Sequence, residues 1–143
     1  MRILGIDPGL HATGYGVITA QPGRVEVVAA GAIRPSPRQP LGQRLLNLYQ
    51  GLTAVIQTHH PAIAVLEGIF THYRHLTTAA MMAHARGVAC LVSAQHELEL
   101  VDYLPTRVKK ALTVNGHASK EQVARVVGVW LGGRDTSWSS DAT

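Results

Sequence analysis

The stretch that decides the fold is Arg2–Ile18, which reads RILGIDPGLHATGYGVI. An apolar run, Ile3–Ile6, ends on the carboxylate Asp7, and a second apolar run, Tyr15–Ile18, leads away from it. Proline followed by glycine is typical of a type II turn, because proline fixes φ and glycine supplies a positive φ. The pattern predicts a turn at Pro8-Gly9 that aims Asp7. Two interpretations of Asp7 stay open here: an active-site acid, or a residue that only opens the turn.

Strands and one helix are expected on either side of this stretch. Turn residues separate the β-branched runs Thr13–Thr19 and Arg24–Arg34, so the short links predict three antiparallel strands at the start of the chain. Apolar residues at spacings of three and four predict an amphipathic helix from Leu41 to residues 59–61, where a proline ends it. The run Ala62–Leu66 has no polar alternation, which indicates a strand buried on both faces.

The second half of the chain alternates between helical and extended patterns. Phe70–His75 is expected to be a loop, Glu97–Asp102 a fifth strand, Pro105 to Leu112 a short helix, and Ser119 to Leu131 a helix that opens with a capping box. A helix between the loop and the fifth strand has a stripe of mostly small residues, which predicts close approach to the sheet. The stripe is Leu76, Ala80, Ala83, Gly87, Cys90 or Leu91, and Ala94. The fold class is therefore a single α/β domain over residues 1–143.

Composition narrows the class of protein further. The chain has 143 residues, of which 46% are hydrophobic and 15% are charged, so a disordered protein is excluded. The apolar runs are too short to span a membrane, and the first residues lack the features of a signal peptide. A single cysteine, Cys90, excludes a disulfide framework. We therefore expect a soluble, cytoplasmic protein.

Positive charge is concentrated in one segment. The net charge is +4, and every lysine of the chain lies between residues 107 and 125, where Glu121 is the only acid. The cluster is Arg107, Lys109, Lys110, Lys120 and Arg125. Such a cluster is expected where a protein contacts phosphates, although an ordinary solvated helix face would have the same composition.

Acids follow separate elements of the predicted fold. Glu67 comes directly after the predicted strand Ala62–Leu66, and Asp141 lies near the end of the chain. If the first and fourth strands are parallel neighbours, Asp7 and Glu67 emerge side by side at one end of the sheet. Carboxylates that converge in this way suit a two-metal Mg²⁺ site for phosphoryl displacement. A glutamate that merely turns toward solvent is the alternative for Glu67.

A resemblance rests on several motifs in order: GIDPG at 5–9, TGYGVI at 13–18, a strand ending in glutamate with Phe70 three residues on, ARGVA at 85–89, and RVKKALTVNGHASKEQV at 107–123. Together they resemble the RuvC family of Holliday-junction resolvases, from Met1 to Asp141. The resemblance implies an RNase H-like nuclease domain, with a five-stranded mixed sheet of three antiparallel and two parallel strands flanked by helices. It also implies a Mg²⁺-dependent endonuclease of recombination and repair that cuts four-way DNA junctions.

The resemblance implies roles for particular residues. Asp7, Glu67 and Asp141 match the family's first three catalytic acids, which implies that Asp7 bridges two Mg²⁺ ions, replaceable by Mn²⁺, while the other two acids each hold one. Lys120, and Lys109 with it, would offset charge on the phosphate. The expected DNA-binding residues are Phe70, Tyr73, Arg74, His75, Arg107, Lys109, Lys110 and Lys120. The implied partners are a second copy of the chain in a homodimer, and the RuvA and RuvB branch-migration proteins. Met81 and Met82 are the candidate contacts between the two copies.

Two departures from the family pattern stand out. The family's fourth acid follows its third by three residues, which places that position beyond Thr143. The site is therefore expected to be incomplete in the sequence given, and the final helix to be missing from it. The opening of the second helix, THYRHLTTAAMMAHARG at residues 71–87, also differs from the commoner family wording.

Two other functions stay open on the sequence alone. A protein that binds junctions without cutting them would share the basic segment and the fold. An actin-like or sugar-kinase-like ATPase would share a first strand that ends in an acid and a glycine turn. The length of 143 residues and the lack of further glycine-rich phosphate loops argue against the ATPase.

Overall fold

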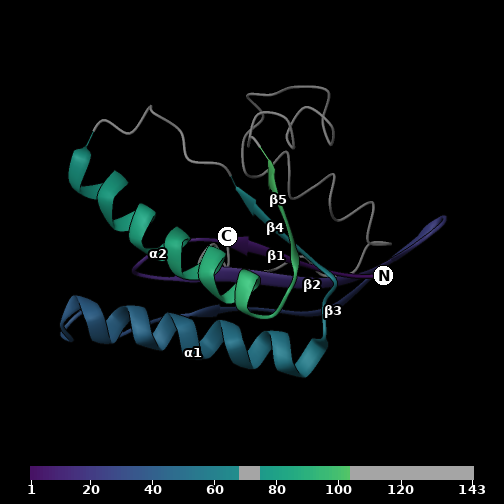
Figure 1. The fold of residues 1–143 in the computed structure, drawn as a ribbon, viewed down its shortest axis with the longest axis horizontal. Helices are drawn as coiled ribbons and strands as arrows, with labels where there is room; N and C mark the ends of the chain where they lie inside the picture. Colours follow the sequence, from purple (N-terminus) through teal and green to yellow (C-terminus); the bar gives the residue numbers. More distant parts are fainter. Residues whose placement is uncertain (68–74, 104–143) are drawn as a thin grey trace.

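The computed structural model describes residues 1–67 and 75–103, with elements in the order β1, β2, β3, α1, β4, α2, β5 (Figure 1). Their bounds are Arg2–Asp7 for β1, Thr13–Gln21 for β2, Arg24–Ile33 for β3, Leu41–His59 for α1, Ile63–Glu67 for β4, Leu76–Gln95 for α2 and Glu99–Tyr103 for β5. Each predicted strand and helix in this part of the chain is present. The ends of the predicted strands differ from the observed ones by one or two residues.

All five strands form one sheet in the order β3-β2-β1-β4-β5. β1 pairs antiparallel with β2, and β2 pairs antiparallel with β3. β4 joins the other edge of β1 in parallel, and β5 joins β4 in parallel. The predicted mixed sheet of three antiparallel and two parallel strands is confirmed, and β1 lies at its centre.

The hydrophobic core lies between one face of the sheet and both helices. Alternate residues of the strands point to this face, because successive side chains of a strand lie on opposite sides. The core consists of Leu4, Ile6, Val17, Leu52, Val55, Ile56, Leu66, Ala89 and Val92. β4 also alternates, with only Ala64 and Leu66 fully buried. The expectation that this strand is buried on both faces is therefore wrong for the described residues.

The two Pro-Gly pairs of the chain adopt different structures. Gly23 has a φ of 73° after Pro22, as a type II turn requires, and it closes the tight link between β2 and β3. Gly9 lies outside the left-handed region, so the type II turn predicted at Pro8-Gly9 is wrong. Glycine is needed there for a different reason. A Cβ at Gly9 would lie 2.4 Å from the carbonyl oxygen of Ala12, so the chain passes too close for any side chain.

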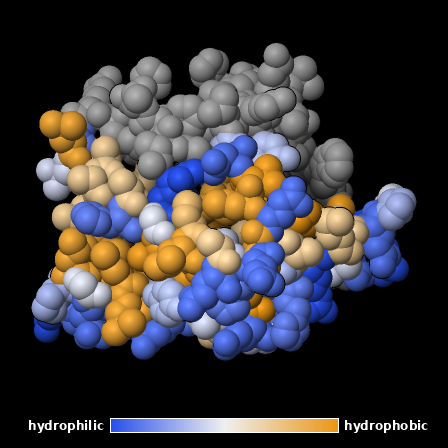
Figure 2. Space-filling view, in the orientation of Figure 1, coloured by the Kyte–Doolittle hydropathy of each residue, from blue (hydrophilic) through white to orange (hydrophobic). Residues whose placement is uncertain are grey.

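α2 packs on the sheet through a different stripe from the predicted one. Its buried residues are Ala85, Ala89, Val92 and Ser93, whereas the predicted stripe is exposed except at Cys90, which is half-buried against the core. Leu76 is 89% exposed and Leu91 is 60% exposed. The prediction failed because small and apolar residues occur on both sides of this helix, so spacing alone does not identify its inner face. Close approach through small residues is nevertheless observed, and apolar side chains also remain on the surface that α2 and α1 present in Figure 2.

Three expectations fall wholly or largely outside the described residues: the loop Phe70–His75, the short helix Pro105 to Leu112 and the capped helix Ser119 to Leu131. Within residues 1–67 and 75–103, neither helix is long and apolar enough to cross a membrane.

Candidate active site

Two carboxylates end neighbouring strands at the centre of the sheet. The register between parallel β1 and β4 places Ile6 beside Leu66, and the next residues are Asp7 and Glu67. Since neighbouring strands lie about 4.8 Å apart, the two acids start from adjacent backbone positions. The condition under which the two acids were expected side by side, that the first and fourth strands are parallel neighbours, is met.

These two acids belong to the sheet face opposite the helices. Ile6 and Leu66 are buried in the core beneath α1 and α2. Asp7 and Glu67 each follow one residue later, so their side chains project from the other face. Both acids are half-buried.

The donor set determines which metal this site suits. Carboxylate oxygens are the ligands that hard divalent cations take, and Mg²⁺ is often held by one or two carboxylates together with water and substrate phosphate. No group of three or more His, Cys, Asp or Glu side chains in residues 1–67 and 75–103 is placed to hold a metal ion. The described donors are therefore the carboxylate pair Asp7 and Glu67, and this pair fits a hard cation that keeps part of its hydration shell.

The loop after Asp7 is fixed to the body of the protein at two points. The buried Thr13 hydroxyl accepts a hydrogen bond from the Gly9 N–H at 3.2 Å and donates one to the Gly9 carbonyl at 2.7 Å. Leu10 is buried where the two helices meet, and Arg44 of α1 donates a hydrogen bond to its carbonyl at 3.3 Å. The backbone directly after Asp7 is thereby held without the predicted turn.

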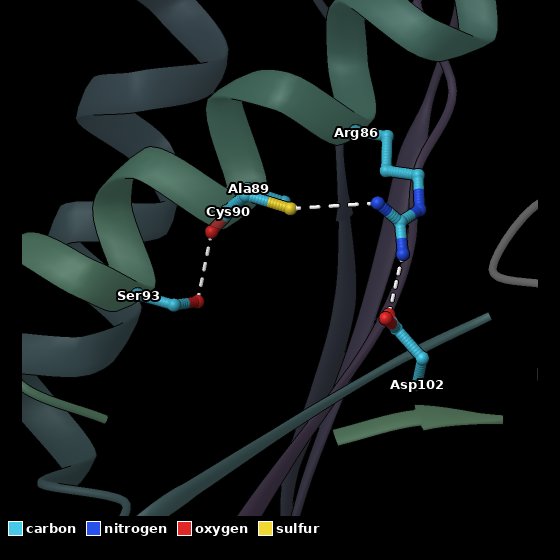
Figure 3. A network of polar contacts seen from close by, with 5 residues as sticks. All are labelled: Arg86, Ala89, Cys90, Ser93 and Asp102. Carbon is cyan, nitrogen blue, oxygen red and sulfur yellow. Dashed lines mark hydrogen bonds and ion pairs between the residues drawn. The ribbon is translucent and has the colours of Figure 1, made fainter. Parts of the chain in front are cut away.

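A third acid at the same end of the sheet lies on the opposite face. Asp102 of β5 is in register with Leu66, so its side chain lies on the helix side. Arg86 of α2 forms an ion pair with Asp102 and donates a hydrogen bond to Sγ of Cys90 at 3.6 Å (Figure 3). The Arg86 side chain is only 18% exposed. This pair ties α2 to the carboxyl end of β5.

The sequence prediction did not single out Thr13, Arg44, Arg86 or Asp102. One signal was available for Arg86, because it is the only Asp, Glu, Lys or Arg residue between Leu76 and Gln95. A lone charge in an apolar helix requires a partner if that side of the helix is buried. No comparable signal marked Thr13, since threonine is an ordinary residue at the start of a strand.

Most of the predicted site residues lie outside the described part of the chain. His75 is described, and it is exposed at the N-cap of α2. Asp7 and Glu67 are brought together as set out above. The predicted residues outside the described ranges are Phe70, Tyr73, Arg74, Arg107, Lys109, Lys110, Lys120 and Asp141.

Known proteins are similar to this chain in sequence and in fold. A family model described as "Crossover junction endodeoxyribonuclease RuvC" matches residues 3–142. A protein of that name from Myxococcus xanthus is 42% identical over 131 residues, which cover 92% of this chain and 68% of its relative. One from Rhodopirellula baltica is 43% identical over 129 residues, covering 90% of this chain and 72% of the relative. The solved structure of Thermus thermophilus RuvC in complex with a Holliday junction substrate is similar with a TM-score of 0.91 and 27% identity, covering 99% of this chain and 86% of that one.

Proposed function

The chain belongs to the RuvC family of crossover junction endodeoxyribonucleases, and we propose that it resolves four-way DNA junctions at a metal site centred on Asp7 and Glu67. It is thus a nuclease that hydrolyses DNA phosphodiester bonds, with an RNase H-like fold. The observation that carries the proposed site is the register of β1 and β4, which brings two acids distant in sequence to adjacent strand ends.

The proposed roles of the residues come from their match to the family motif. Asp7, at the end of the central strand, would be the ligand common to two Mg²⁺ ions, and Glu67, at the end of the neighbouring strand, would hold one of them. A divalent cation bound there supplies Lewis-acid activation of the scissile phosphate. By its match to the family motif, Asp141 holds the second ion. Lys120 and Lys109 offset negative charge on the phosphate as it develops during cleavage.

Junction DNA is the proposed substrate. The Thermus relative was solved with such a junction, and this chain has the concentrated positive charge between residues 107 and 125 that phosphate contacts require. Phe70 and the residues from Tyr73 to His75 are proposed to contact bases or phosphates near the crossover. Replacement of Lys109 by alanine is expected to lower the salt dependence of junction affinity by about one phosphate contact.

A homodimer is the proposed assembly, because resolution of a junction needs two symmetrical cuts. The outward side of α2 supports this proposal, since it exposes large apolar side chains at Leu76, Met81 and Leu91. Met82, the other predicted contact between copies, is half-buried and lies nearer the inward side of α2, since Ala85 and Ala89 follow it by three and seven residues. RuvA and RuvB are the proposed partners in branch migration, and the cytoplasm is the proposed location.

A gel assay with a labelled four-way junction tests the function. The protein is expected to shift the junction in both Mg²⁺ and Ca²⁺ and to nick it only in Mg²⁺, because Ca²⁺ binds oxygen ligands with a looser geometry than catalysis requires. A shift without nicks in Mg²⁺ would instead identify a protein that binds junctions but does not cut them. If the protein neither shifts nor nicks the junction, both functions are contradicted.

A further inference from the structure

Thr13 is an unusually constrained residue next to the proposed metal site. It is 1% exposed, and it begins β2 just after the loop that follows Asp7. Its hydroxyl forms two hydrogen bonds with one residue, Gly9. It donates to the Gly9 carbonyl oxygen at 2.7 Å and accepts from the Gly9 N–H at 3.2 Å. Both polar groups of the Gly9 backbone are therefore satisfied by one side chain.

These two hydrogen bonds replace a backbone turn. No backbone–backbone hydrogen bond closes the segment Pro8–Ala12 in the described part of the chain, and Gly9 does not adopt the positive φ of a type II turn. The Ala12 carbonyl approaches Gly9 so closely that an added Cβ would lie 2.4 Å from it. The Thr13 hydroxyl is thus the contact that holds the Gly9 backbone, while Arg44 and the buried Leu10 side chain fix the next residue of the loop.

The hydrogen bonds between Thr13 and Gly9 lie close to Asp7, the proposed metal ligand, both along the chain and across the sheet. Asp7 lies two residues before Gly9, and its register partner across β1 and β2 is Gly14, the residue after Thr13. Together with the pairing of Asp7 and Gly14, the link from Thr13 to Gly9 closes a small ring that runs through Asp7, Pro8 and Gly9 on one side and through Thr13 and Gly14 on the other. Functional groups need to be held within about 0.5 Å of their working geometry, which is the scale that such a link controls.

We propose that Thr13 is a positioning residue of the nuclease site: its hydroxyl fixes the loop after Asp7 and thereby sets the affinity of that carboxylate for the catalytic divalent cation. The inference rests on the proposed function of Asp7 as a metal ligand. Residues that support metal ligands without touching the metal typically change affinity or activity by about 10- to 100-fold when they are replaced.

The test compares hydroxyl-bearing and hydroxyl-free variants. Thr13→Val keeps the shape of the side chain and removes the hydroxyl, whereas Thr13→Ser keeps the hydroxyl. Thr53→Val is the matched control, because the Thr53 hydroxyl also donates to a carbonyl four residues back, at 2.7 Å from Tyr49 O, within α1. Each protein is titrated with Mn²⁺ in the absence of DNA, and the free ion is measured by electron paramagnetic resonance. The Mg²⁺ midpoint of junction cleavage is measured in parallel.

Thr13→Val is expected to bind Mn²⁺ about tenfold more weakly and to require correspondingly more Mg²⁺ for cleavage. Thr13→Ser and Thr53→Val should stay close to the unaltered protein in both measurements. Equal Mn²⁺ affinity in Thr13→Val and the unaltered protein would overturn the inference. Failure of the unaltered protein to cleave in Mg²⁺ would instead count against the proposed function, so the two failures are distinguishable.

Folding is followed by circular dichroism in every variant, because a buried valine leaves the Gly9 N–H and carbonyl without their partner. If Thr13→Val does not fold, Thr13→Ser is compared with Thr13→Ala, which share the loss of the methyl group and differ only in the hydroxyl. Weaker Mn²⁺ binding in the alanine variant alone would support the positioning role. If no hydroxyl-free variant folds, Thr13 is a structural residue and the inference is overturned.

Discussion

The two faces of the sheet use acids differently at the same end. On the helix side, Asp102 is paired with Arg86, and the pair joins β5 to α2. On the other side, two acids, Asp7 and Glu67, end adjacent strands. Like charges in such neighbouring positions are unfavourable unless something positive lies between them. In this sheet, therefore, it is the register of β1 and β4, which places a second acid beside Asp7 on the same face, that distinguishes the candidate site from the single acid Asp102.

The largest effect on cleavage is expected from removing a charge on the sheet face that carries Asp7 and Glu67, called here the two-acid face. Glu67→Gln should lower junction cleavage in Mg²⁺ by at least about 100-fold, because loss of a direct metal ligand should exceed the effect of losing a supporting residue. Junction binding in Ca²⁺ should persist. Single-turnover cleavage of a labelled junction measures the first effect and a gel shift the second.

Glu99→Gln is the matched control for that variant, because Glu99 is an exposed acid at the opposite end of the sheet, beside Ile63. Its cleavage rate should equal that of the unaltered protein. Comparable losses in both variants would mean that the general acidity of the sheet matters rather than the two-acid face.

A smaller effect, on stability alone, is expected from the helix-side face. Arg86→Met keeps most of the buried aliphatic volume and removes the ion pair, so the free energy of unfolding should fall by about 1 kcal/mol. The loss is modest because the Asp102 side chain is 59% exposed and water screens the pair. Urea denaturation measures it. If Arg86→Met lowered the cleavage rate without lowering the free energy of unfolding, the helix-side face would also contribute to cleavage.

The smallest effect is expected at a position remote from both faces. His60 ends α1 in the left-handed region with a φ of 49°, which is unfavourable for a residue with a side chain. His60→Gly should raise the free energy of unfolding by about 0.5 kcal/mol, after the greater entropy of unfolded glycine is subtracted. His60→Ala, which keeps the strain, should give no gain. A loss of stability in the glycine variant would mean that the imidazole itself stabilises the helix end.

The sequence predicted the sheet well because strand signals and short links are local. The run Ile3–Ile6, the Gly23 turn and the uninterrupted apolar run before Glu67 were each visible in a few residues. The strand order was not predicted from the residues: a helix between two strands favours a parallel pair, but which strands are neighbours came only from the structure. These local features placed Asp7 and Glu67 at the ends of two strands, and the register of β1 and β4 in the structure makes those ends adjacent.

The details that the sequence did not reveal depend on contacts between distant residues. The inner face of α2 is set by packing against α1 and by the pairing of Arg86 with Asp102, 16 residues away. The loop after Asp7 is shaped by the Thr13 side chain and by the approach of the Ala12 carbonyl, rather than by the Pro8-Gly9 pair itself. Local propensity cannot report such contacts, because it describes the backbone one turn at a time.

The most direct test of a metal site at Asp7 and Glu67 compares Asp7→Asn with Asp102→Asn. Each change removes one negative charge from the same end of the sheet without a change of shape, on opposite faces. Single-turnover cleavage of a labelled four-way junction in Mg²⁺, with a gel shift in Ca²⁺, is the measurement. We predict no detectable cleavage by Asp7→Asn with junction binding retained, and an unchanged cleavage rate for Asp102→Asn. Cleavage by Asp7→Asn, or an equal loss of cleavage in both variants, would contradict a metal site on the two-acid face.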